Sequence, residues 1–106
     1  MGHVIWTEPA LDDVRVIMEH IAKDSPAYAA RLGTRIVEAP RGLARFPEGG
    51  SIVPEFDRDD IREILVRPYR IIYTTRDQHC FVAAVVHGSR DLARVIDPND
   101  LGSRGA

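Results

Sequence analysis

Residues 61–92 read IREILVRPYRIIYTTRDQHCFVAAVVHGSRDL, and no other stretch of the chain says as much about the fold. β-Branched and aromatic residues dominate three runs, 61–66, 69–75 and 80–86, and polar turn residues separate them. The runs predict three strands in an antiparallel meander. The last strand leads into a basic segment that contains a histidine, residues 87–91 (HGSRD). Strand ends of this kind let a rigid scaffold present arginine and histidine side chains to a partner.

The residues before this stretch predict one short strand and two helices. Residues 3–7 alternate apolar with polar side chains, so a first strand is expected there. Pro9 suits the first turn of a helix that runs to about Lys23, and Pro26 starts a second helix in the same way. The second helical pattern contains Pro40, which removes a backbone hydrogen bond and crowds the preceding turn. A kink or an early end is therefore expected at that proline.

The expected order of elements is βααβββ, which is an α+β fold. The helical hairpin packs on one face of a small, mainly antiparallel sheet, because its apolar stripe needs a partner. The other sheet face is expected to be partly open, so that basic side chains can gather there. Residues 1–96 form the single domain, residues 51–60 form a solvated acidic loop, and residues 97–106 form a flexible tail. The residues expected in or beside the core are Trp6, Ile36, Leu43, Ile64, Val66, Ile71 and Tyr73.

Composition fits one small soluble domain. The chain has 106 residues, of which 44% are hydrophobic and 28% charged. No apolar run approaches the roughly 20 residues that span a bilayer, and the first residues do not resemble a signal peptide, so a cytoplasmic protein is expected. The single cysteine, Cys80, lies in an apolar strand and is interpreted as a buried side chain. The histidines lack the spacing of metal ligands, so neither metal nor cofactor is expected.

Charge is segregated along the chain. Lys23 is the one lysine among 14 basic residues, and the arginines concentrate in residues 31–46 and 61–76, whereas residues 48–60 are acidic. Arginine suits planar, bidentate recognition of carboxylates and phosphates, although a GC-rich genome would produce the same bias. A net charge of −2 argues against a generic nucleic-acid binder.

Five short phrases, in this order of elements, resemble the RelE/ParE superfamily of type II toxins. They are WTEPA at 6–10, FP at 46–47, RE at 62–63, PYRIIY at 68–73 and HGSRDL at 87–92. The resemblance covers residues 3–92. It implies a small prokaryotic toxin of the plasmid-stabilisation type. It also implies a cognate antitoxin that wraps the toxin in a hetero-oligomer and neutralises it.

The superfamily has two branches with different mechanisms. RelE-like members cleave mRNA on the ribosome without a metal, which needs an acid, a base and several cations around one phosphate. By resemblance, Arg70 matches their phosphate-holding arginine and His87 lies near a catalytic histidine of some members, but the lysine pair is missing. ParE-like members are not enzymes and poison DNA gyrase by trapping cleaved DNA; the ending HGSRD resembles theirs more closely. Gyrase poisoning is the favoured hypothesis, a RelE-like endonuclease is the alternative, and a non-toxic relic that only binds antitoxin is the third.

The candidate site residues follow from this resemblance and from the arginine clusters. Those expected to contact the target are Arg70, His87, Arg90 and Asp91. Those expected to contact the antitoxin are Arg31, Arg35, Arg62 and Arg70. Four of them have a plainer interpretation: Arg70 pairs with Glu63 across the hairpin, His87 is a polar strand end, and the helix residues Arg31 and Arg35 are a solvated face. Catalysis by Arg70 and His87 requires both side chains on one sheet face, which depends on the register of the strands.

Overall fold

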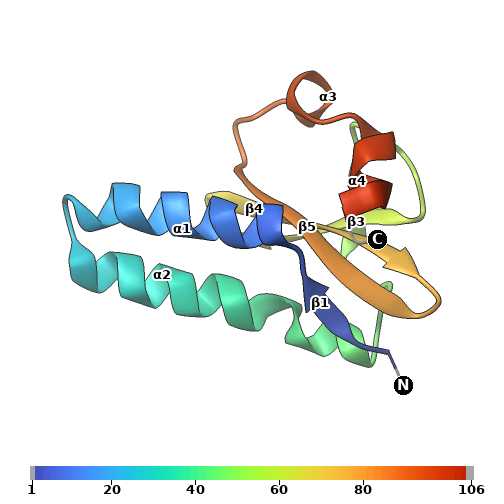
Figure 1. The fold of residues 1–106 in the computed structure, drawn as a ribbon, viewed down its shortest axis with the longest axis horizontal. Coiled ribbons are helices and arrows are strands. Elements are labelled where there is room, and N and C mark those ends of the chain that lie inside the picture. Colours follow the sequence, from blue (N-terminus) through green and yellow to red (C-terminus); the bar gives the residue numbers. More distant parts are fainter. Residues whose placement is uncertain (1, 105–106) are drawn as a thin grey trace.

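The computed structural model describes residues 2–104, with side chains up to Leu101, and it shows a five-stranded sheet with helices on both faces (Figure 1). The strands are β1 (Val4–Trp6), β2 (Ser51–Ile52), β3 (Ile61–Val66), β4 (Tyr69–Arg76) and β5 (His79–His87). The helices are α1 (Glu8–Ala22), α2 (Pro26–Glu38), the 3-10 helix η1 (Ala39–Ala44), α3 (Leu92–Val95) and α4 (Pro98–Arg104). The α+β class and the helical hairpin agree with the prediction.

The two long helices begin where their capping residues predict. The Thr7 hydroxyl accepts from the Ala10 N–H at 3.4 Å, and the Ser25 hydroxyl accepts from the Tyr28 N–H at 3.2 Å. A proline follows each cap in the first turn. Helix α2 ends at Glu38, and the chain continues through Pro40 as η1. The expected early end at this proline is confirmed.

The sheet has the order β1-β5-β4-β3-β2. Strands β3, β4 and β5 form the predicted antiparallel meander. Strand β1 pairs in parallel with β5 at one edge, and β2 pairs antiparallel with β3 at the other. Strand β2 was not predicted, because two residues are too few to show a periodic pattern. The register shifts between Ile72 and Tyr73, where a bulge interrupts the pairing of β4 with β5.

The first face of the sheet packs against α1 and α2 through a layer of apolar side chains. Its buried members are Ala10, Val14, Leu32, Ile36, Val66, Ile71, Val82 and Val85. The predicted core is confirmed: Ile36, Leu43, Val66, Ile71 and Tyr73 are buried, and Trp6 and Ile64 are partly buried against them. Burying a valine, leucine or isoleucine side chain contributes about 1.5–3 kcal/mol to the free energy of folding.

The second face of the sheet is not open, which corrects the expectation from the sequence. The segment at 53–60, α3 and α4 cover it, and Figure 1 shows α3 and α4 on the side away from the α1–α2 hairpin. The buried members of this layer are Val53, Ile61, Ile72, Ala83, Ala84, Leu92, Ile96 and Leu101. Residues 98–104 form a helix, and Leu101 has no exposed surface, whereas residues 105 and 106 of the predicted tail lie outside the described residues. The apolar residues that produce this layer are too sparsely spaced to show a helical stripe.

Candidate functional site

Arg70 lies inside the second layer, where two glutamates hold it. Its Nε donates to Glu63 at 2.5 Å, and its two terminal nitrogens donate to Glu55 at 2.7 and 2.8 Å. The side chains of Arg70 and Glu63 are each 10% exposed. The hydrogen bonds from Arg70 lower the pKa of Glu55 from 4.5 to about 2, and those from Glu55 raise the pKa of Arg70. The guanidinium is thus paired with internal carboxylates, and its contact with target and antitoxin stays a prediction.

Glu55 also connects the second layer to the C-terminal segment. Its Oε2 accepts from the Leu92 N–H at 3.2 Å, at the first residue of α3. The pairing of Arg70 with Glu63 is the plainer interpretation made from the sequence, and it is confirmed. The contribution of Glu55 was missed, because it lies 15 residues from Arg70 in what was expected to be a solvated loop.

His87 and Arg70 lie on opposite faces of the sheet. Arg70 pairs with Val86 across β4 and β5, and His87 pairs with Tyr69. The Tyr69 and His87 rings meet edge to face at 5.6 Å, and Tyr69 packs against the α1–α2 layer. Arg70 points into the other layer. The condition for catalysis by this pair, that both side chains lie on one sheet face, is therefore not met.

His87 and Arg90 instead share a groove, here called the His87–Arg90 groove. It has a volume of about 650 Å³ and runs between α1, the end of β5 and α3. Its lining includes Asp13, Val16, Ile17 and His20 from α1, Tyr69 from β4, Val85, Val86 and His87 from β5, and Arg90, Val95 and Ile96 from the segment that follows. His87 and Arg90 are predicted from the sequence, but the α1 residues and Val95 are not, because helical spacing says nothing about which strand end a helix will lie beside.

The turn after β5 fixes the orientation of the His87 ring. Its Nδ1 accepts from the Ser89 N–H at 3.1 Å and lies 2.8 Å from the Ser89 hydroxyl. A neutral ring that accepts at Nδ1 carries its proton on Nε2, which is then the remaining donor. Asp91 has a structural role: its carboxylate accepts from the Ala93 N–H at 3.1 Å and caps α3.

The four arginines expected to contact the antitoxin divide into two groups. Arg31 and Arg35 lie exposed on α2 and make no ion pair among the described residues. The Arg62 guanidinium donates to the carbonyls of Asp59 and Gly50, each at 3.0 Å. It joins the loop before β2 to the loop before β3, so its role is structural. Together with the buried Arg70, this leaves Arg31 and Arg35 available to a partner.

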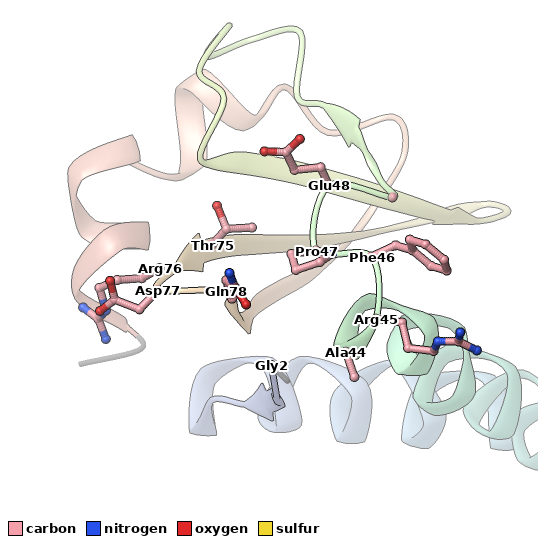
Figure 2. A pocket seen from close by; sticks show the side chains of 11 residues that line it. Gly2, Ala44, Arg45, Phe46, Pro47, Glu48, Thr75, Arg76, Asp77 and Gln78 are labelled. Carbon is pink, nitrogen blue, oxygen red and sulfur yellow. The ribbon is translucent and has the colours of Figure 1, made fainter.

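A second groove lies at the opposite end of β5, beside the turn between β4 and β5 (Figure 2). Its volume is about 860 Å³, and it is lined on one side by Arg45, Phe46 and Glu48 and on the other by Arg76 and Asp77. Phe46 is 66% exposed, and the Arg45 guanidinium lies 5.7 Å from the centre of its ring. Two acidic and two basic side chains line this groove, so its charges balance.

Within residues 2–104, no cluster of three or more His, Cys, Asp or Glu side chains could hold a metal ion. Cys80 is buried, as interpreted from the sequence, and burial raises the pKa of its thiol. No helix in the described part of the chain is long and apolar enough to span a membrane.

Comparison with known proteins gives consistent matches. The family model described as "ParE toxin of type II toxin-antitoxin system, parDE" matches residues 4–92. Toxin RelE2 of Caulobacter vibrioides is 33% identical over 91 residues, which cover 85% of this chain and 99% of that toxin. A chain of the solved structure "Chromosomal ParDE TA system from P. aeruginosa" matches with a TM-score of 0.69 and 21% identity, covering 82% of this chain and 96% of that chain. At this identity the structural match establishes the fold.

Proposed function

The chain belongs to the ParE toxin family, and from this membership we propose that it binds and poisons DNA gyrase until a cognate antitoxin neutralises it. It is a toxin of a type II toxin–antitoxin system. The proposal concerns the target, the route of neutralisation and the place of action, which is the cytoplasm, where gyrase works on the chromosome.

The observation that most supports a binding protein over a nuclease is the burial of Arg70 between Glu55 and Glu63. Metal-free RNA cleavage needs several cations around one phosphate. Arg70 already has two carboxylate partners, and His87 lies on the other sheet face. The chain also has a single lysine, Lys23, which lies just beyond the end of α1. These facts favour inhibition by contact.

The target-binding residues in this proposal are His87 and Arg90. Both are exposed: His87 ends β5, an interior strand of the sheet, and Arg90 lies in the turn that follows it, so a rigid strand supports both. Ser89 orients the His87 ring, and Asp91 caps the helix that follows. An arginine and an oriented imidazole are well suited to contact a protein surface or a phosphate at the gyrase–DNA junction.

A partner antitoxin has a second natural point of contact on α2. Arg31 and Arg35 are four residues apart on the exposed side of the helix, about 6 Å along its axis. Neither forms an ion pair among the described residues, so acidic side chains of an antitoxin can reach both. An antitoxin that contacts α2 while neutralising the toxin should co-purify with it as a hetero-oligomer.

The test adds purified toxin to a gyrase supercoiling and DNA-cleavage assay and, in parallel, to a translation reaction with ribosome-bound mRNA. Accumulation of cleaved DNA on gyrase, reversed by the antitoxin, is the expected result, with mRNA left intact. Arg90→Ala should weaken the effect, whereas Arg94→Ala, on the neighbouring α3 and 87% exposed at its side chain, should not. Codon-specific mRNA cleavage with gyrase unaffected would establish the RelE-like alternative, which the name of the Caulobacter relative keeps in view. No effect in either assay, together with antitoxin binding, would identify a non-toxic relic.

A further inference from the structure

Exposed arginines follow the outer side of α2 and η1, which form one helical run of residues 26–44. The buried residues of this run form a single inner face: Ala29, Leu32, Gly33, Ile36, Pro40 and Leu43. The arginines lie outside that face, are exposed and make no ion pair among the described residues; they are Arg31, Arg35, Arg41 and Arg45. Four guanidinium groups along one helical run can therefore meet the anionic groups of a partner.

The charge of this surface differs from that of the whole chain. Residues 26–48 contain four arginines against two glutamates, Glu38 and Glu48, whereas the chain as a whole has a net charge of −2. Eight of the 16 acidic residues lie instead in α1 and in residues 55–60. The local charge suits a polyanion, and the acidic remainder of the chain makes its binding weak and strongly dependent on salt.

An aromatic ring lies at the end of this surface. Phe46 is 66% exposed, the largest exposed fraction among the large hydrophobic residues that the structure describes. The Arg45 guanidinium lies 5.7 Å from the centre of the ring, and Figure 2 shows both side chains extending to the same side, away from the turn between β4 and β5. An exposed ring beside unpaired guanidinium groups suits a strand whose bases stack while its phosphates are neutralised.

The backbone around Phe46 is held by hydrogen bonds within the protein. The Phe46 N–H donates to the Gly42 carbonyl at 3.1 Å, and the Phe46 carbonyl accepts from the Gly49 N–H at 2.9 Å. The hydroxyl of Tyr73, a fully buried residue, donates to the Pro47 carbonyl at 2.9 Å. The ring is therefore presented by a loop that loses little conformational entropy when a partner binds.

We propose that the arginine–phenylalanine surface, which consists of Arg31, Arg35, Arg41, Arg45 and Phe46, binds single-stranded nucleic acid. A base stacks on Phe46, and the arginines contact the phosphates along the strand. A single strand is favoured over a duplex because its bases are free to stack, and over an acidic protein segment because the aromatic ring then has a π-face to meet. The inference goes beyond the proposed function, because the strand can come from DNA held by gyrase or from mRNA on the ribosome.

The first test measures the charge contribution. Fluorescence anisotropy follows the binding of purified toxin to a labelled oligothymidylate and to a labelled oligouridylate over a series of salt concentrations. For four phosphate contacts, the logarithm of the binding constant should fall against the logarithm of salt concentration with a slope of about −3. Arg41→Ala and Arg45→Ala should each reduce that slope by about 0.7. Arg94→Ala, which changes an exposed arginine on α3, should leave it unchanged.

Substitutions at Phe46 test stacking separately from charge. Phe46→Leu keeps an apolar side chain but loses the aromatic face, so it should weaken binding by about fivefold or more while the salt slope stays the same. Phe46→Trp should bind within about twofold of the wild type, because indole offers a comparable face. Leu65→Ala, at another exposed apolar position, is the control and should bind like the wild type. Melting temperatures within a few degrees of the wild type verify that all variants are folded.

Three results would overturn this inference: no binding of either strand at the lowest salt concentration, undiminished binding by Phe46→Leu, or equally tight binding of an oligoglutamate of the same length. The last would make an acidic protein segment the occupant, in line with the antitoxin contact proposed for Arg31 and Arg35. Tighter binding of thymidylate or of uridylate would assign the strand to DNA or to RNA and support the inference in either case. A toxin that binds the strand but leaves gyrase unaffected would refute the proposed function alone.

Discussion

Arg70 and Ile71 are neighbours on β4, yet they belong to two layers built in different ways. Ile71 has no exposed surface and packs among aliphatic side chains from α1, α2 and β5. Arg70 points to the other face, where it joins Glu55 and Glu63 beneath the C-terminal segment. The first layer depends on non-directional apolar contact, and the second adds directional bonds between charged groups. The two faces of one strand can therefore belong to different layers. One layer is predictable from the periodicity of apolar residues, and the other depends on ion pairs with residues distant in the sequence.

The two layers should respond differently to the loss of one member. Truncating an apolar side chain leaves a cavity that its neighbours partly fill. Removing the one cation of the second layer leaves two carboxylates without a counter-charge, in a place where water cannot fully solvate them. This contrast gives four predictions.

The largest effect is expected from Arg70→Met, which should lower the free energy of unfolding by about 3–5 kcal/mol because Glu55 and Glu63 lose their shared partner. Urea denaturation followed by circular dichroism measures it. Replacing all three residues, as Arg70→Met with Glu55→Leu and Glu63→Leu, should recover most of the loss, since no charge then remains buried. A single Arg70→Met variant within about 1 kcal/mol of wild type would contradict the assignment of a buried ion cluster.

Next is Ile71→Ala, for which we expect a loss of about 3 kcal/mol, within the range for a fully buried isoleucine. Leu65→Ala is the matched control on the neighbouring strand, where the leucine is 49% exposed and the change should stay within about 0.5 kcal/mol. Urea denaturation followed by circular dichroism measures both variants. Equal effects at the two positions would mean that the strand faces have been assigned in reverse.

Acid should weaken the second layer before the first. The pKa of Glu55 is about 2 in the folded protein and 4.5 in its usual range, so its contribution is fully present above pH 4.5. That contribution is lost as the pH falls towards 2, and a shift of this size corresponds to about 3 kcal/mol. Stability measured from pH 6 to pH 2 should therefore fall steeply in wild type and less steeply in Glu55→Gln. Parallel curves for the two proteins would show that Glu55 is not paired.

The smallest effect should come from Leu101→Ala on α4, at about 2 kcal/mol. Leu101 is fully buried, but it lies on a short helix near the C-terminus that can readjust. Hydrogen exchange should become faster at the backbone amides of β4 and stay unchanged at those of α1. If Leu101→Ala leaves both stability and exchange unaltered, the tail predicted from the sequence would be the better description.

Much of the first layer could be predicted from the sequence, because its helices and strands are marked by local sequence patterns. The capping residues and prolines mark α1 and α2, and Pro40 marks the end of α2. Alternation predicted the faces of Arg70 and Ile71 correctly. The bulge at Ile72 and Tyr73 was beyond such reasoning: it brings both Ala83 and Ala84 into the second layer, which a strict alternation forbids.

The candidate site was predicted in part, and the division has a physical cause. The exposed positions of His87, Arg90, Arg31 and Arg35 follow from strand ends and helix faces. The ion pair between Arg70 and Glu55 forms only when two segments 15 residues apart in the sequence fold against each other, and no local sequence pattern predicts that contact. The groove needs α1 to lie alongside the end of β5, which is a contact across more than 60 residues of sequence, as the bond from Val85 to Asp13 illustrates.

The sequence by itself therefore determined the first strand, the helical hairpin, the three-stranded meander and the superfamily, since each of these depends on spacing within a short window. The tertiary structure decided what covers the second sheet face, which carboxylates hold Arg70 and which side chains meet beside His87. These outcomes depend on pairing between distant segments, where the balance of burial, charge and register is settled only when the whole chain is packed.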